Sequence, residues 1–567
     1  MAITVSNTGK LVIGTTTGGT LIARGDIILA QTAVSRTSGF YALTLNPGST
    51  LEFDASQATT PGSQTYVCGP SQSLGPNARV FINGSSSARC TVRSNAGGGN
   101  GRFSNRGFNT RVGSMRVTYC DFTRIGDASN VAFQPYLSSS TTEPDEFSMA
   151  NCTFTSGGQI SHTSLMASNT IFSLTDCIWT TTASTSCIHT VTNGTVIGAT
   201  GTRQVKRCAF DKQFGVSSTV QDFSFYQVLF QENFSLSDTY NWAQFEQCIV
   251  RKPTAVDNLL PGPTATHCYW LCDFATGNPH FFQVSASRAC TINGVILEYT
   301  GSGGDGDGIG LANGTPASTL RHTIKYCLVL PRSGDSAQAS CTLTTHSANS
   351  NQQWASIDHN TFMGGSAADH GVQLNETTAT PAGALPLYRS NLYWDTSARG
   401  NHFRTVVRSA GACTTDTLTA SGATNNCAYT ASVAPSGAQT EVTAGYQNSI
   451  GTYYNTPTTS GVPGTNDVNV NPGFIDTTRN FANWATTQSQ AASVANTITL
   501  LRSNLAVNIP GLLLWVRGGF APTHSSLRVA GHDTASIGAS NYSKSTRSTT
   551  KLDQMRSAIN TRYSVSV

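Results

Sequence analysis

The 567-residue sequence has little charge and very little lysine. Asp, Glu, Lys and Arg make up only 11% of it, against roughly 25% in an average soluble domain. A coiled coil or helical bundle would need many more of these residues. The net charge is only +4 and no basic stripe is visible, so we expect no nucleic-acid partner. No apolar run approaches the roughly 18 residues of a membrane span, so we expect no membrane insertion.

Small polar and aromatic residues take the place of the missing charge. Ser and Thr make up about a quarter of the chain, well above ordinary usage, and there are 53 Gly. The 25 Phe, 17 Tyr and 7 Trp are spread along the sequence, which argues against disorder. This composition favours an all-β protein with many turns.

The chain also contains fifteen cysteines. A secreted protein would pair most of them in disulfides, whereas a protein assembled in a cytosol would keep them as thiols. The first residues lack the basic region and the continuous apolar region of a secretory signal peptide. The positions of the cysteines distinguish these two cases.

The cysteines reveal a repeat. In Val117-Thr-Tyr-Cys120-Asp-Phe122 an apolar residue, two variable residues, Cys, one variable residue and an apolar residue follow one another. Similar segments recur with a mean period of about 27 residues, a length typical of solenoid repeats. The central positions of the copies are Cys120, Cys152, Cys177, Cys208, Val228, Cys248, Cys272, Val295, Cys327, Asn360 and Asn391.

The spacing within each copy predicts two short strands that meet at a corner. The central residue and the aromatic or apolar residue two positions later lie on one face of a strand. The apolar residue three positions earlier has the wrong parity for that strand, so a bend falls between them. One such corner per period describes one coil of a β-solenoid.

Over about residues 40–480 the chain resembles the right-handed parallel β-helices of the pectate-lyase-like superfamily. The resemblance implies coils of three short parallel sheets, with the central residues stacked in an internal ladder. Asn360 and Asn391 depart from the cysteine pattern and are expected to mark an Asn ladder at the turn. With strands about 4.8 Å apart, 11–13 coils would form a rod on the order of 60 Å long.

We divide the chain into three parts. Residues 1–40 are expected to cap the first coil or to attach the rod to a larger assembly. Residues 41–480 form the β-helix, and residues 481–567 form a closing or assembly segment. Within the last part, 488–504 is predicted to be a helix. Residues 509–516 are expected to form either a trimer interface or a buried final strand.

Four acids are weak candidates for catalysis: Asp273, Glu298, Asp305 and Asp307. A glycosidase needs two carboxyl groups that flank the scissile bond. However, the position after each ladder residue is mostly not acidic, as Ile178, Ala209, Leu229 and Ile249 illustrate. Scattered turn acids are the commoner explanation, so we expect no catalytic residue.

No cofactor or metal is expected either. His267 to Cys272 lacks the second ligand pair of a zinc site, and residues 301–310 form a flexible Gly-Asp turn rather than a calcium loop. His532-Asp533 is not accompanied by a nucleophile elbow. Exposed aromatic residues could stack on sugars, namely Tyr240, Trp242, Trp354 and Trp394.

A β-helix hosts many functions, so the fold does not determine the activity. Three expectations favour a non-catalytic structural component of a virus particle. The first residues do not resemble a signal peptide, the cysteines are expected to pack as thiols, and no column of acidic residues runs along the coils. A bacteriophage spike, fibre or capsid decoration protein, assembled in the host cytoplasm, fits best. We expect a homotrimer that contacts other virion proteins and host surface polysaccharide. The alternatives are a polysaccharide lyase or glycoside hydrolase of the tailspike type, and a secreted or cell-surface adhesin.

Overall fold

The computed structural model describes about half of the chain. These residues are 3–6, 9–15, 18–24, 27–30, 41–54, 67–68, 79–95, 114–126, 132–133, 146–162, 171–180, 186–191, 203–217, 223–232, 234–236, 243–252, 264–273, 282–284, 290–300, 309–312, 322–330, 339–345, 355–364, 370–376, 387–395, 403–407, 423–430, 466, 468, 470–528, 530–533 and 535–539.

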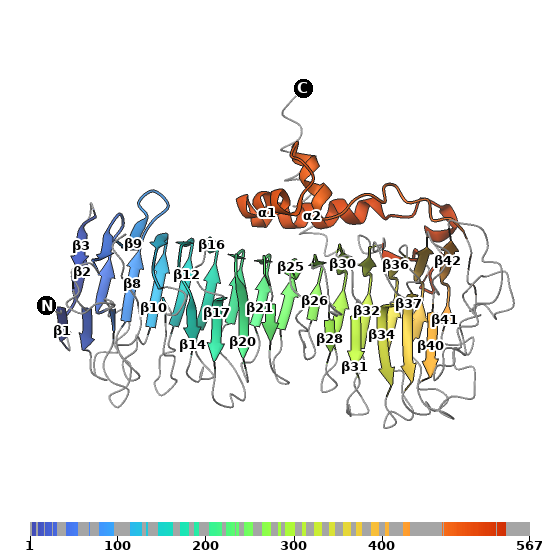
Figure 1. The fold of residues 1–567 in the computed structure, drawn as a ribbon, viewed down its shortest axis with the longest axis horizontal. Helices are drawn as coiled ribbons and strands as arrows, with labels where there is room; N and C mark the ends of the chain where they lie inside the picture. Colours follow the sequence, from blue (N-terminus) through green and yellow to red (C-terminus); the bar gives the residue numbers. More distant parts are fainter. Residues whose placement is uncertain are drawn as a thin grey trace.

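The strands stack into a long parallel β-helix, with the N-terminus at one end (Figure 1). Every pairing between the described strands is parallel, and successive strands of a sheet come from successive coils. The first long sheet contains β2 (Leu11–Ile13), β5 (Leu43–Leu45), β8 (Arg79–Asn83), β10 (Ser114–Thr118), β12 (Glu146–Ala150), β15 (Ile171–Thr175), β18 (Arg203–Lys206), β21 (Phe223–Tyr226), β24 (Ala243–Glu246), β26 (Thr264–Thr266), β29 (Thr291–Asn293), β32 (His322–Lys325), β35 (Ala355–Asp358), β38 (Leu387–Arg389) and β41 (Ala423–Thr424).

The second long sheet meets the first at a corner in every coil. It contains β3 (Thr20–Ala23), β6 (Thr50–Phe53), β9 (Cys90–Ser94), β11 (Cys120–Thr123), β13 (Thr153–Thr155), β16 (Ile178–Thr180), β19 (Ala209–Phe210), β22 (Leu229–Phe230), β25 (Ile249–Lys252), β27 (Tyr269–Cys272), β30 (Ile296–Tyr299), β33 (Leu328–Val329), β36 (Thr361–Gly364), β39 (Leu392–Asp395) and β42 (Cys427–Thr430).

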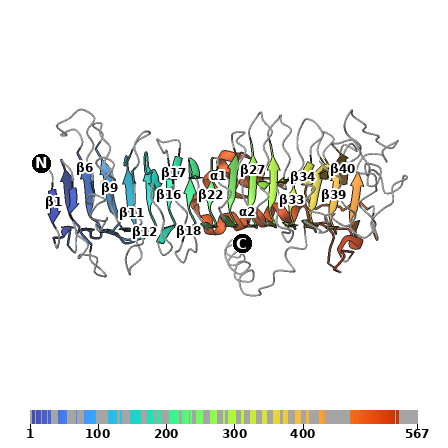
Figure 2. The same cartoon turned by 90° about the horizontal axis from the view of Figure 1, so that it is seen from below.

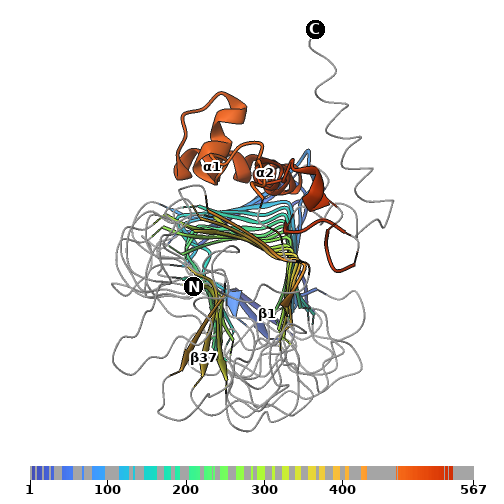
Figure 3. The same ribbon diagram turned by 90° about the vertical axis from the view of Figure 1, so that its right-hand side faces the viewer.

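Shorter sheets complete parts of the coils, and the end-on view shows the strands enclosing the core (Figure 3). They are β1 (Ile3–Ser6), β4 (Ile27–Ala30) and β7 (Val67–Cys68); β14 (Ile160–His162), β17 (Ser186–Val191), β20 (Gln213–Ser217) and β23 (Phe234–Leu236); and β28 (Phe282–Val284), β31 (Ile309–Ala312), β34 (Ala339–Thr345), β37 (His370–Glu376) and β40 (Phe403–Val407).

Each long sheet has 15 strands, more than the 11–13 coils that the repeat predicted. Relative to the eleven ladder positions, three coils precede Cys120 and one follows Asn391. The first coil contains β2 and β3, which pair with β5 and β6, so these strands of residues 1–40 already belong to the β-helix. The last coil contains β41 and β42.

The predicted bend is a single residue in the left-handed region between the two long sheets. Such backbone angles are uncommon outside glycine and are tolerated in tight turns. Because this corner residue lies immediately before the ladder position, the chain changes direction without a loop. The corner residues are Tyr119, Asn151, Asp176, Arg207, Gln227, Gln247, His267, Gly294, Tyr326, His359, Ser390 and Asn425, with φ values of 47–65°.

The ladder residues and the aromatic residues two positions later point into the core. Phe154 stacks between Phe122 and Trp179, with ring centroids 5.0 and 4.2 Å apart. One predicted rung is wrong. Tyr269 pairs with Ile249 and Ile296, so Cys268, and not Cys272, lies between Cys248 and Val295 in the ladder. Cys272 is buried too, but it pairs with Lys252 and Tyr299.

Three Asn residues form the final rungs of the ladder, and all are buried. The Oδ1 atom of Asn391 accepts hydrogen bonds from Asn360 N and Nδ2, both at 2.9 Å. Asn426 Oδ1 repeats the contact with Asn391 N at 2.9 Å. The Asn391 amide also donates to Ile357 O at 2.8 Å, so each rung ties two neighbouring coils together.

The closing segment runs along the outside of the second long sheet (Figures 1 and 2). It contains the 3₁₀ helix η4 (Ala482–Gln488), α1 (Val494–Ser503), α2 (Leu505–Gly519) and the 3₁₀ helix η5 (Ser525–Arg528). Residues 509–516 therefore lie in a helix and not in a final strand. No helix among the described residues is both long enough and apolar enough to span a membrane.

An apolar strip on the outer face of the second long sheet explains why the helices dock there. We call this the outer strip: Ala209, Leu229, Ile249, Tyr269, Leu271, Ile296 and Leu328. It packs against Ile509, Leu512 and Val516 of α2, all fully buried. Residues 509–516 thus bury their apolar face on their own chain, and Leu514 remains 44% exposed.

Candidate functional site

The acids named as weak catalytic candidates do not form an open pair in the described part of the chain. Asp273 is bound by Arg251, with Nη2 and Oδ2 2.7 Å apart. Glu298 is 4% exposed and lies beneath the closing segment. Asp305 and Asp307 lie outside the described residues.

Glu298 connects the closing segment to the β-helix. Its carboxylate accepts hydrogen bonds from the hydroxyl of Tyr269 and from the backbone N–H of Phe481, the latter at 3.0 Å. Burial raises the pKa of Glu298 to about 6 and raises that of Tyr269 well above its usual value. The contacts of this carboxyl group are with the protein itself, so its position suits docking rather than attack on a substrate.

The described cysteines are packed thiols. All of those for which the structure gives a bonding state are buried and free. Burial raises the pKa of the Cys120, Cys152 and Cys177 thiols well above the usual value, which keeps them protonated and unreactive. Their S–H groups make weak contacts with backbone carbonyls, such as Cys177 with Met149 O at 3.5 Å.

A groove of about 750 Å³ lies between α1 and the second long sheet. Its lining mixes apolar and polar side chains: Thr180, Gln231, Arg251, Val494, Ala495, Ile498, Thr499 and Arg502. Arg502 donates to Trp179 O at 2.7 Å, so its guanidinium group is held against the second long sheet. The Nε2 atom of Gln231 is buried and has no hydrogen-bond partner among the described residues.

Of the aromatic residues proposed for sugar stacking, the structure describes Trp394, and it does not line this groove. Trp394 packs edge-on against Phe474, which precedes the closing segment, with ring centroids 5.9 Å apart. Tyr240, Trp242 and Trp354 lie outside the described residues.

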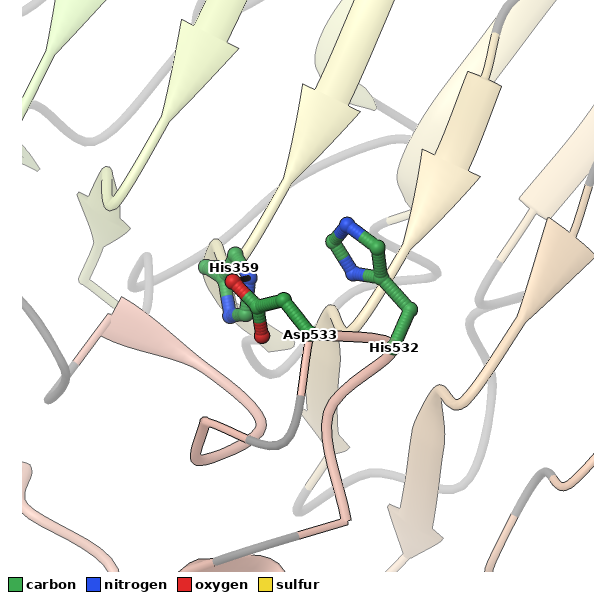
Figure 4. A group of neighbouring side chains, drawn as sticks. All are labelled: His359, His532 and Asp533. Carbon is green, nitrogen blue, oxygen red and sulfur yellow. Dashed lines mark hydrogen bonds and ion pairs between the residues drawn. The ribbon is translucent and has the colours of Figure 1, made fainter.

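A second group of polar side chains lies where the closing segment reaches the corner between β35 and β36. His359 is the left-handed corner residue of that coil and is 2% exposed. His532 and Asp533 follow η5 in the closing segment and come beside it (Figure 4). One ligating atom from each of the three side chains lies within 4.8 Å of the others.

Hydrogen bonds fix the orientation of both imidazole rings. His359 Nδ1 lies 2.9 Å from the carbonyl of Ser536, and His359 Nε2 lies 3.1 Å from Asp533 Oδ2. His532 Nδ1 lies 2.8 Å from Ser390 Oγ, which also accepts from the His532 backbone N–H. Burial and the charge of Arg389 lower the pKa of His532.

The sequence did not predict this cluster, although it drew attention to His532-Asp533. His359 is visible in the repeat as the residue before Asn360, a position at which His267 also stands. Nothing in the spacing links it to residues more than 170 positions later. Comparison of the chain with protein-family models, with curated proteins and with solved structures finds no match.

Proposed function

We propose that this protein is a non-catalytic structural component of a virus particle, with a bacteriophage spike, fibre or capsid decoration protein as the best fit. One observation supports the proposal that the protein is not catalytic: both of the described candidate acids are engaged in contacts within the protein. Arg251 neutralises Asp273, and Glu298 is sealed beneath the closing segment. Neither carboxyl group is placed to protonate a leaving group or to activate water on a bound glycan.

Two further features support a virion component. Packed free thiols suit a protein that folds in a reducing cytoplasm, where virus particles assemble. The closing segment lies flat along the rod, so the outer strip is covered before any partner binds. The pectate-lyase-like resemblance is part of this proposal, because tailspikes of that fold act at host surfaces.

We place host glycan binding at the groove between α1 and the second long sheet. Its mixture of apolar and polar side chains, including the Gln231 amide, suits a sugar ring with hydroxyl groups. Replacement Thr499→Arg would fill this groove, whereas Leu514→Arg on the exposed face of α2 would not. Binding of host surface polysaccharide should therefore be lost only in the first variant.

Incubation of the purified chain with host surface polysaccharide tests the enzymatic alternative. We expect neither new reducing ends nor unsaturated sugars. Either product would establish a polysaccharide hydrolase or lyase and overturn the proposal.

Proteomic analysis of purified particles tests the location. We expect the chain in the particles, and a solution mass of three times 59.8 kDa for the expected homotrimer. Recovery of the chain only from the culture supernatant or the bacterial surface would favour the adhesin alternative.

A further inference from the structure

The contact between His359 and Asp533 brings two electron-pair donors together. The carbonyl of Ser536 can only accept a hydrogen bond, so Nδ1 of His359 carries a proton. In a neutral ring the lone pair of Nε2 then faces the Asp533 carboxylate at 3.1 Å. Two acceptors at this distance repel each other, unless a proton or a metal ion lies between them.

The surroundings of the cluster are those of a metal ligand set. Histidine ligands in proteins almost always donate their second N–H to a carbonyl or a carboxylate, which fixes the ring. His359 has this arrangement with the Ser536 carbonyl, whereas Nδ1 of His532 lies in hydrogen-bonding contact with the Ser390 hydroxyl. These two contacts orient both rings in advance.

We propose that His359, His532 and Asp533 form a binding site for a first-row divalent transition-metal ion, with Zn²⁺ as the reference ion. Two imidazoles and one carboxylate suit zinc, cobalt or nickel. Calcium and magnesium prefer oxygen-only ligand sets and are disfavoured. The site is separate from the groove and does not depend on the proposed function.

The separations are compatible with one ion after a small movement. Bonds of about 2.0–2.2 Å to a shared ion can bridge the 3.1 Å between Nε2 and Oδ2. The largest ligand separation, up to 4.8 Å, exceeds the roughly 3.4 Å edge of a tetrahedral zinc site. His532 or Asp533 would therefore move inward by about 1–1.5 Å on binding, which their partly exposed positions in the closing segment allow.

Such an ion would join two parts of the chain that are distant in sequence. His359 belongs to the corner of the β-helix, whereas His532 and Asp533 belong to the closing segment. The ion would thus clamp the end of the closing segment to the rod. Its role would be structural.

Titration of the untagged, chelator-treated full chain with Co²⁺ and Zn²⁺ tests the site. We expect one equivalent of Co²⁺ with the d–d absorption of a low-coordinate site, and its displacement by Zn²⁺. Asp533→Asn, His532→Gln and His359→Asn should each weaken Co²⁺ binding at least about tenfold. Asparagine is chosen at position 359 because it tolerates the left-handed corner.

His524→Gln is the matched control, since this histidine lies in the same segment and its side chain contacts only Ser526 among the interactions given for it. It should bind Co²⁺ as the original chain does. Should His359→Asn fail to fold, the two closing-segment variants still decide the question. Absence of saturable Co²⁺ binding, or equal affinity in the Asp533→Asn and His532→Gln variants, would overturn the proposal and leave a proton-bridged ion pair.

Discussion

Glu298 shows how one residue can look catalytic in the sequence and be structural in the fold. An acid in a β-helix strand is a natural candidate for glycan cleavage. In the structure the same carboxyl group is removed from water and holds Tyr269 and Phe481 together. Because burial penalises its charged form, the contact depends on whether the group is protonated.

We predict that Glu298 makes the protein less stable as the pH rises through about 6. Its pKa rises from 4.5 to about 6 on folding, so its contribution is complete below pH 4.5 and is lost above pH 6. This shift corresponds to about 2 kcal/mol. Denaturant unfolding between pH 4 and 8 should show this loss, and Glu298→Gln should remove it. Glu146→Gln, at an exposed ion pair with Arg116, should keep the loss; an unchanged slope in Glu298→Gln would contradict the prediction.

The Asn ladder gives a second prediction at this scale. Asn391→Ala removes the acceptor of Asn360 N and the donor to Ile357 O, and leaves both buried. We expect a loss of about 2–5 kcal/mol in the free energy of unfolding. Cys208→Ala in the same column removes only a thiol and should cost about 1 kcal/mol. Equal losses in the two variants would show that the Asn ladder contributes no more than packing.

Among the elements, α2 and the outer strip depend on each other. The strip is apolar in the middle coils, where α2 covers it, and polar at Asp121 and Thr153 before the helices begin. The apolar face of α2 consists of Ile509, Leu512 and Val516. Each surface would otherwise expose its apolar side chains to water, so burial provides the attraction.

We predict that Leu512→Ala weakens this docking by about 2–5 kcal/mol, because it leaves a cavity at a fully buried position. Leu514→Ala, two residues later in the same helix, should change stability by less than about 0.5 kcal/mol, since Leu514 faces solvent. Limited proteolysis within 481–520 and thermal unfolding would measure both effects. Similar protease sensitivity in the two variants would contradict this account of the interface.

The strands and corners were predictable from sequence because each coil repeats the same spacing of apolar residues around its corner. The register at Cys268 was not, since Ala265-Thr-His-Cys268-Tyr-Trp270 fits the repeat as well as the segment centred on Cys272. Only pairing with neighbouring coils decides between them. The His359 cluster was also hidden, because its members meet through docking of the closing segment and not through any local pattern.

Across the whole molecule, the closing segment fastens many coils together. Arg502 reaches the carbonyl of Trp179 in β16, whereas the Ala530 carbonyl accepts from Asn425 just before β42. Between these contacts, Arg517 Nη1 donates to Tyr326 O at 3.0 Å. The coils contact mainly their neighbours, so in the part of the chain that the structure describes these contacts connect coils that are far apart along the rod.

Truncation after residue 480 should therefore leave a rod whose outer strip is exposed. We expect this shortened chain to bind a dye specific for apolar surface and to aggregate, whereas the full chain should do neither. Light scattering and dye fluorescence of the refolded proteins would measure the difference. If the truncated chain is soluble and does not bind the dye, the closing segment is not needed to keep the outer strip from water.

The position of this cover also imposes an order on biosynthesis. A solenoid can stack coil upon coil as the chain leaves the ribosome, since each coil needs only the one before it. The helices that cover the middle coils follow them in the sequence by more than 150 residues and are translated after them. At about 5–20 residues per second, the strip around Leu229 would wait on the order of 15–60 seconds for α2. During that interval the nascent rod would be vulnerable to sticking to its neighbours on the same messenger RNA.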